Sequence, residues 1–242
     1  MQEWKQAYSL AKLELRMSKF GFLSAFLFSM FILFFIVTSI ESYMENGFVG
    51  IDFFFVLLFS VATIWTKPKE FQIKKVSGDL IVLPLVVMQK QLPIKQDVIM
   101  KSRFIVHFFY SFPFQLLALI GIYFMSPLPE MLSVGSFIAF AIIWLSFGVY
   151  AGYVFPLSEI GTKGPLTSTV GTIFIGVTLL IVLLSIFTMI HVLFENGIVY
   201  WSIILAQKWP IVSSIASILL AFFGFAHWQH YMKKAMDKLD YL

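Results

Sequence analysis

Charged residues are scarce in this 242-residue chain, where Asp, Glu, Lys and Arg make up 12% against 60% hydrophobic residues. A soluble domain has about 25% charged residues, so this composition excludes a protein with a fully water-exposed surface. It predicts an integral membrane protein. Cysteine is absent altogether, which excludes disulfides, thiolate metal sites and lipid attachment to cysteine.

Sequence motifs of known chemistry are also missing. The string nearest to a GxxxxGK[ST] phosphate loop is GTKG at 161–164, which lacks the spacing that wraps a phosphate. No HExxH, GxSxG or paired-carboxylate motif occurs, and the four His residues form no ligand pattern. We therefore expect no catalytic residue, metal site or cofactor in this chain, and no nucleic-acid partner.

Long apolar runs dominate what is present. A membrane-spanning helix needs roughly 20 apolar residues, and runs of this length favour helices over barrel strands. The sequence predicts an all-α integral membrane protein, a single transmembrane domain over 1–242. Six segments qualify as spans: 20–40, 48–65, 105–125, 132–155, 166–190 and 209–226.

Basic residues between the spans predict the orientation of the chain. Placing the amino terminus in the cytoplasm puts 16 of the 17 Lys and Arg residues on the cytoplasmic side, as the positive-inside rule requires. The opposite orientation leaves one there. We therefore expect both termini in the cytoplasm, in a multi-pass protein of a plasma or inner membrane that contacts the lipid bilayer.

Two stretches outside the spans predict elements at the membrane surface. Residues 1–19 have helical spacing with Trp4 and Tyr8 on one face, which favours an interfacial helix over a plain basic flank of the first span. The run IVYWSIILA at 198–206 predicts a short re-entrant or interfacial helix anchored by Trp201 and Trp209. A loop packed on the outer surface is an equally good interpretation.

Few polar residues lie within the predicted spans. Asp52 is the one clear acid, one turn from the outer end of the second span. Acids in a span are often functional, yet Asp52 can reach the interface, so a pathway role is the less favoured interpretation. Gln115 follows Pro113 and is interpreted as the polar partner of a kink rather than a substrate site. The 29 Phe residues favour an amphipathic or lipid-like substrate for any cavity.

The longest polar segment, 66–104, contains the apolar run LIVLPLVVM at 80–88 and a break at Pro93. It predicts a short helix along the inner membrane face, a turn, and a helix that rises as the third span. An Asp97–Lys101 pair would support the start of that helix. The apolar face must be buried in the interface or against another protein, and a lipid-surface helix without a partner is the alternative.

Three strings resemble the ABC-2 type permeases, the membrane subunits of ATP-driven transporters. QLPIKQDVIMKSRF (91–104) is similar to their LeuPro-x-(Ser/Lys)-x-x-x-Ile-x-x-(Ser/Gly)-(Lys/Arg) signature, FPLSEIGTKG (155–164) to a stretch between spans four and five, and LAKLELRM (10–17) to their basic lead. The six spans and the external element before the sixth also match. Lys95 stands where Ser is usual, and the run before LeuPro is unusually apolar.

The resemblance implies a permease that exports a hydrophobic or amphipathic substrate, such as a peptide, an antimicrobial or a lipid-like molecule. In that family a coupling helix between spans two and three docks on a separate ATPase subunit, which would bind ATP and Mg²⁺. A second copy, or a similar permease, would complete the pathway. The residues expected to contact the ATPase are Gly78, Asp79, Leu80, Leu83, Pro84, Val87, Met88, Lys90, Leu92, Pro93, Ile94 and Lys95.

Two other classes of function stay open. A membrane scaffold or sensor that binds an ATPase without transporting anything would have the same sequence features. An intramembrane enzyme is less favoured, because it needs paired acids, His ligands or a Ser/Lys dyad at depth.

Overall fold

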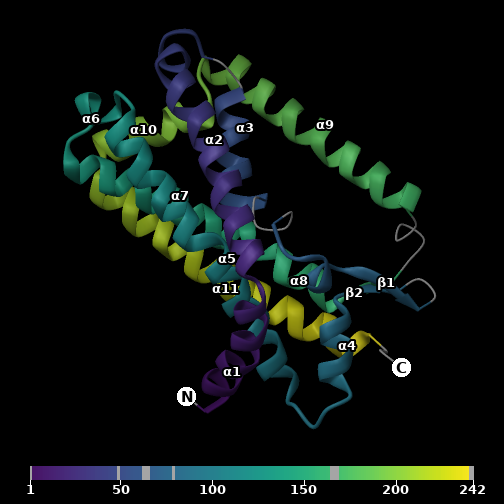
Figure 1. Ribbon diagram of the computed structural model, residues 1–242. Coiled ribbons are helices and arrows are strands. Elements are labelled where there is room, and N and C mark those ends of the chain that lie inside the picture. The colour runs from purple at the N-terminus through teal and green to yellow at the C-terminus, as the bar shows by residue number, and fades with distance from the viewer. Residues whose placement is uncertain (1, 48–49, 62–65, 78–79, 164–168, 240–242) are drawn as a thin grey trace.

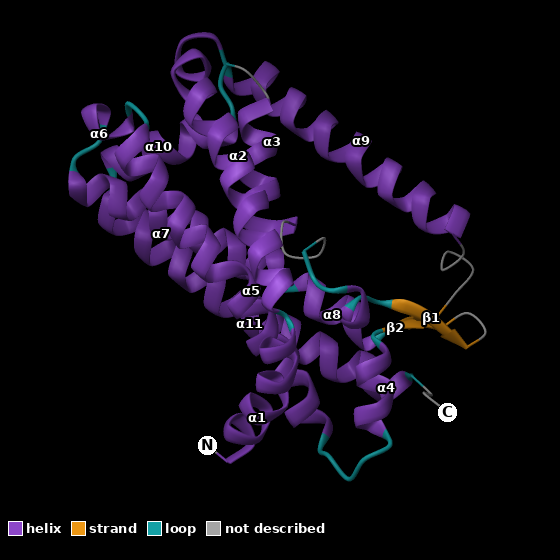
Figure 2. Ribbon diagram, viewed as in Figure 1, coloured by secondary structure: helices purple, strands orange, loops and turns teal. Residues whose placement is uncertain are grey.

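The computed structural model of the chain describes residues 2–47, 50–61, 66–77, 80–163 and 169–239. The described chain is nearly all helical (Figure 2). Among the described residues, five helices are long and apolar enough to cross a membrane, which makes this a multi-pass membrane protein. They are α2 (Lys19–Asn46), α5 (Gln96–Met125), α7 (Val134–Gly152), α9 (Thr169–Phe194) and α11 (Pro210–Lys238).

The second predicted span is shorter in the described chain than the sequence suggests. It consists of α3 (Gly50–Val56) and a π-helical turn, η1 (Leu57–Val61), which together fall short of the roughly 20 residues a span needs. Residues 62–65 of this prediction lie outside the described residues, so the six-span topology stays a prediction. The Gln115 side chain donates a hydrogen bond to the Phe59 carbonyl in η1 at 2.9 Å, so it binds the backbone of a different helix, and its role beside a kink at Pro113 stays a prediction.

Shorter elements lie at the two ends of the molecule (Figure 1). α1 (Gln2–Met17), α4 (Pro84–Lys90) and the C-terminal end of α11 lie at one end, and α6 (Leu128–Met131) and α10 (Ile198–Lys208) lie at the other. The single turn η2 (Lys69–Phe71) and the helix α8 (Val154–Ile160) complete the helices. The two ends of the described chain are therefore on the same side of the helix bundle.

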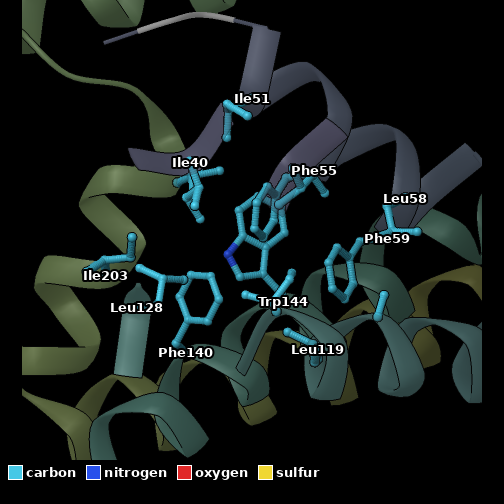
Figure 3. Close-up of a cluster of buried hydrophobic side chains, with 14 of the residues drawn as sticks. Ile40, Ile51, Phe55, Leu58, Phe59, Leu119, Leu128, Phe140, Trp144 and Ile203 are labelled. Carbon is cyan, nitrogen blue, oxygen red and sulfur yellow. The ribbon is translucent and has the colours of Figure 1, made fainter. Parts of the chain in front are cut away.

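The main core joins α2, α3, α5, α7 and α10 around one tryptophan. Trp144 of α7 packs against Phe55 and Phe59, with ring centroids 4.8 and 5.4 Å away, as Figure 3 shows. The Trp144 indole N–H donates to Ser202 Oγ at 3.0 Å, so its polar end is satisfied in the apolar interior. This cluster fixes α10 against α7 and η1.

The helix α9 stands apart from this core (Figure 1). Nearly all of its side chains are exposed, and it meets the body at its end near α3. An apolar helix exposed on all faces is stable only in contact with lipid or another chain. The helix is therefore suited to a membrane environment.

A small sheet corrects the prediction of a helix over 80–88. Leu80–Val82 forms strand β2, paired antiparallel with β1 (Lys74–Ser77) and β3 (Thr162–Lys163). The cause is Pro84: a residue before proline avoids helical geometry, and Leu83 has φ −71° and ψ 118°. Proline suits the first turn of a helix, so α4 begins at Pro84 and the preceding run is extended.

Candidate functional site

The lowest point of the molecule in Figures 1 and 2 is a helix and turn that we call the tip, residues 84–95. α4 supplies the helix, and the turn closes with backbone hydrogen bonds from Leu92 N to Gln89 O at 3.3 Å and from Ile94 N to Leu92 O at 2.7 Å. α5 then begins at Gln96. The predicted order of short helix, Leu-Pro turn and rising helix is therefore present, with the helix starting at Pro84.

The inner face of the tip is fixed to two long helices. Leu83 and Val86 are fully buried in a cluster with Ile99 of α5 and Met232 of α11. The Leu83 N–H donates to the Glu159 carbonyl at 3.0 Å, which joins the base of the tip to α8. The tip is thus anchored to α5, α8 and α11 together.

The outer face of the tip is apolar and exposed. Met88 is 63% exposed and Leu92 is 55% exposed, and Pro93 and Lys95 are exposed beside them.

The other predicted contact residues are less exposed. Half-buried side chains are Val87, Lys90 and Ile94, and Leu80 is buried in β2. Burial lowers the pKa of the Lys90 ammonium. Gly78 and Asp79 lie outside the described residues. The predicted contact residues therefore divide into buried anchors and an exposed rim.

Ion pairs tie the start of α5 to its neighbours. Lys101 Nζ lies 2.5 Å from Glu3 Oε2 of α1, and Lys95 lies 3.8 Å from the same carboxylate. Hydrogen bonding and charge from Lys101 hold the pKa of Glu3 below its ordinary value of 4.5. Asp97 pairs with Lys233 of α11 at 3.3 Å. In place of the expected Asp97–Lys101 pair, each of the two side chains pairs with a neighbouring helix, Asp97 with α11 and Lys101 with α1.

Four charged side chains meet farther into the molecule than the tip, in what we call the charge centre: Glu14, Lys67, Arg103 and Glu159. Arg103 Nη1 lies 2.6 Å from Glu14 and 3.6 Å from Glu159, and Lys67 Nζ lies 3.8 Å from Glu14 and forms a short ion pair with Glu159. They come from α1, the segment before η2, α5 and α8. The charge centre therefore joins four parts of the chain at one point.

All four side chains of the charge centre are buried, and Glu14 and Arg103 are completely so. Buried charges are tolerated when they are paired, and two acids here balance two bases. The pairing is incomplete, because Glu14 Oε1, Arg103 Nη2 and Glu159 Oε2 have no hydrogen-bond partner in the structure. An incompletely satisfied network of this kind depends strongly on the exact placement of its helices.

Sequence reasoning missed the charge centre. One usable signal was the position of Glu14 on the same helical face as Ala7 and Ala11, which are both fully buried. Small residues at i and i+4 allow two helices to approach closely, so an acid one turn further on lies inside the contact. The inward acid predicts a buried cation on the partner helix, which is Arg103.

Asp52 has a structural position at the other end of the molecule. Its Oδ1 accepts hydrogen bonds from the Val199 N–H at 2.8 Å and from the Tyr43 hydroxyl at 3.0 Å. The Tyr43 oxygen in turn accepts from the Tyr200 N–H at 3.0 Å. These bonds satisfy free N–H groups in the first turn of α10. Asp52 thus caps α10 from another helix, and the helical interpretation of 198–206 is confirmed.

The predicted interface anchors are partly exposed at both ends. Trp4 is half-exposed, and Lys101 Nζ lies 5.5 Å from its ring centroid. Tyr8 is exposed on α1, Trp201 on α10, and Trp209 between α10 and α11. Such positions suit aromatic side chains at a membrane surface, and their depth in a bilayer stays a prediction.

No protein-family model, curated protein or solved structure matches the chain at a significant level. Among the described residues, no three His, Cys, Asp or Glu side chains gather as a metal site would need. The function must therefore be argued from the tip and the charge centre themselves.

Proposed function

We propose that this chain is the membrane subunit of an ATP-driven transporter of the ABC-2 type, and that a separate ATPase docks on the tip. The supporting observation is the construction of the tip. Met88 and Leu92 expose apolar side chains at the far end of the helix bundle, with Lys95 beside them. An apolar centre with a polar rim is typical of a protein docking site.

The anchoring of the tip supports a mechanical role. A displacement of α4 acts on α5 and α11 through the buried Leu83 and Val86, and on α8 through the hydrogen bond of Leu83. Packed interiors transmit displacement because they are dense and weakly compressible. Closure of two ATPase subunits on ATP can therefore shift long helices of this chain by way of the tip.

The remaining parts of the proposal follow from the composition of the helices. A pathway needs a second copy of the chain or a similar permease, because five or six narrow helices leave little room inside one subunit. The apolar, Phe-rich helices favour export of a hydrophobic or amphipathic substrate. The partner ATPase supplies the ATP and Mg²⁺ sites, and the chain is located in the cell membrane.

The test is co-purification and activity. The tagged chain is isolated from its own cells in mild detergent, and we expect a phosphate-loop ATPase whose ATP hydrolysis is stimulated by the chain. Met88→Glu and Leu92→Glu place a charge in the apolar contact, and each should abolish stimulation while membrane insertion is unchanged. Met131→Glu is the matched control, because Met131 is exposed on α6 at the opposite end.

Three results would count against the proposal. The first is a preparation without any ATPase, and the second is full stimulation by both tip variants. The third is coupled ATP hydrolysis without ATP-dependent movement of an amphipathic substrate in vesicles, which would favour the scaffold instead.

A further inference from the structure

The charges of α1 are sorted between its two faces. Both acids of the helix point toward α5, where Glu3 pairs with Lys101 and Glu14 pairs with Arg103. The three cations of α1 point the other way and are exposed: Lys5, Lys12 and Arg16. Among the residues that the structure describes, no carboxylate lies within ion-pair distance of these three cations. The outward face of α1 is therefore purely cationic.

An apolar ridge runs beside these cations. Leu13 and Met17 of α1 and Phe20 at the start of α2 are 61, 64 and 85% exposed, and they follow one another at intervals of four and three residues. Isolated exposed apolar residues are ordinary, but a ridge beside a row of cations is the pattern of a helix lying in the headgroup region. The pattern is one-sided because the opposite face is already packed on α5.

The place of α1 in the chain fixes what can cover this face. α1 ends at Met17, and the spanning helix α2 begins two residues later at Lys19. The ridge therefore lies at the level where a bilayer meets water, within reach of lipid headgroups. A cationic face attracts negative headgroups and is indifferent to zwitterionic ones.

We propose that the outward face of α1 binds anionic phospholipid, with Lys5, Lys12 and Arg16 on the headgroups and Leu13, Met17 and Phe20 among the upper acyl chains. This goes beyond an interfacial location, because it assigns a lipid class and the residues that select it. The proposal holds whether or not the chain works with an ATPase.

The absence of cysteine allows a direct test with the full chain. Ser9→Cys, on the exposed face, carries a fluorophore in vesicles of phosphatidylcholine that contain a fixed fraction of spin-labelled phosphatidylglycerol or spin-labelled phosphatidylcholine. We expect stronger quenching by the anionic lipid, reduced by high salt. Cations contribute roughly fivefold each, so Lys5→Gln/Lys12→Gln/Arg16→Gln together should reduce the preference by roughly a hundredfold.

Two controls make the test decisive. Lys234→Gln/Lys238→Gln removes exposed cations from α11 and should leave quenching at position 9 unchanged. Excess inorganic phosphate, added at constant ionic strength, should also leave it unchanged, because a lipid and not a soluble anion is bound. The proposal would be overturned by equal quenching from both lipids, or by displacement of the lipid by phosphate. It would also be overturned if neither lipid quenched the fluorophore, which is the result expected if another protein covers this face.

Discussion

Single charged residues decide how α1 is held. Glu14 accepts from Arg103 inside a fully buried contact, where removal of one partner leaves the other without compensation. Breaking a buried pair lowers stability by about 3–5 kcal/mol, more than an exposed pair contributes. The charge centre thus fixes where α1 must lie, but it is not a large net source of stability.

The Glu14–Arg103 pair predicts a strong non-additivity. We expect Glu14→Gln and Arg103→Gln each to lower the free energy of unfolding in detergent by about 3–5 kcal/mol. The double variant should lose clearly less than the sum, because no uncompensated charge is left from this pair. Lys12→Gln, exposed on the same helix, serves as the control and should change little. Additive losses would show that the two side chains do not interact.

At the scale of elements, α10 depends on a cap from α3. Asp52→Ala leaves the Val199 N–H and the Tyr43 hydroxyl without their acceptor, so the free energy of unfolding should fall by about 1–3 kcal/mol. Amide hydrogen exchange in the first turn of α10 should quicken. Asp52→Asn keeps an acceptor oxygen and should lose less, and the exposed Glu45→Ala should lose nothing. If amide hydrogen exchange in the first turn of α10 were unchanged in Asp52→Ala, Asp52 would not be its cap.

The sheet register can be tested with cysteine pairs in this cysteine-free chain. Lys74 lies opposite Val82, and Lys75 lies opposite Ile81. Opposite residues of an antiparallel pair are at distances that a disulfide can bridge. We expect the pairs 74/82 and 75/81 both to form disulfides under mild oxidation, and the offset pair 75/82 to form little. A helix over 80–82 turns neighbouring side chains about 100° apart, so it would allow at most one of the two pairs.

Local sequence signals predicted some elements and missed others for physical reasons. A helix was one of two equal interpretations of the run before α11, because Gly197 and Pro210 delimit one apolar run, and the structure shows the helix α10 there. The strand at 80–82 was missed although its pairing with Lys74–Ser77 is local, because its second pairing, with 162–163, is a contact across some 80 residues that no local pattern contains. The charge centre was missed for the same reason, since Glu14 and Glu159 meet only after α1 and α8 have packed on α5.

At the scale of the whole molecule, composition and the long apolar runs predicted a multi-pass helical membrane protein, and the five long apolar helices of the described residues confirm this. The number of spans and the orientation stay predictions, because they depend on the bilayer as much as on packing. The tip was placed within a few residues from the sequence, since the Pro93 break and the apolar run are both local. The tip is also anchored to α11, which is more than 130 residues away along the chain, and this contact is visible only in the folded structure.

Site-directed photo-crosslinking at the tip tests the central claim most directly. A photoreactive amino acid replaces Met88 in the full chain in its own cells, and Met131 at the opposite end is the control position. We expect a crosslink from position 88 to a phosphate-loop ATPase and none from position 131. A crosslink from position 88 only to lipid, or to the ATPase equally from both positions, would contradict it.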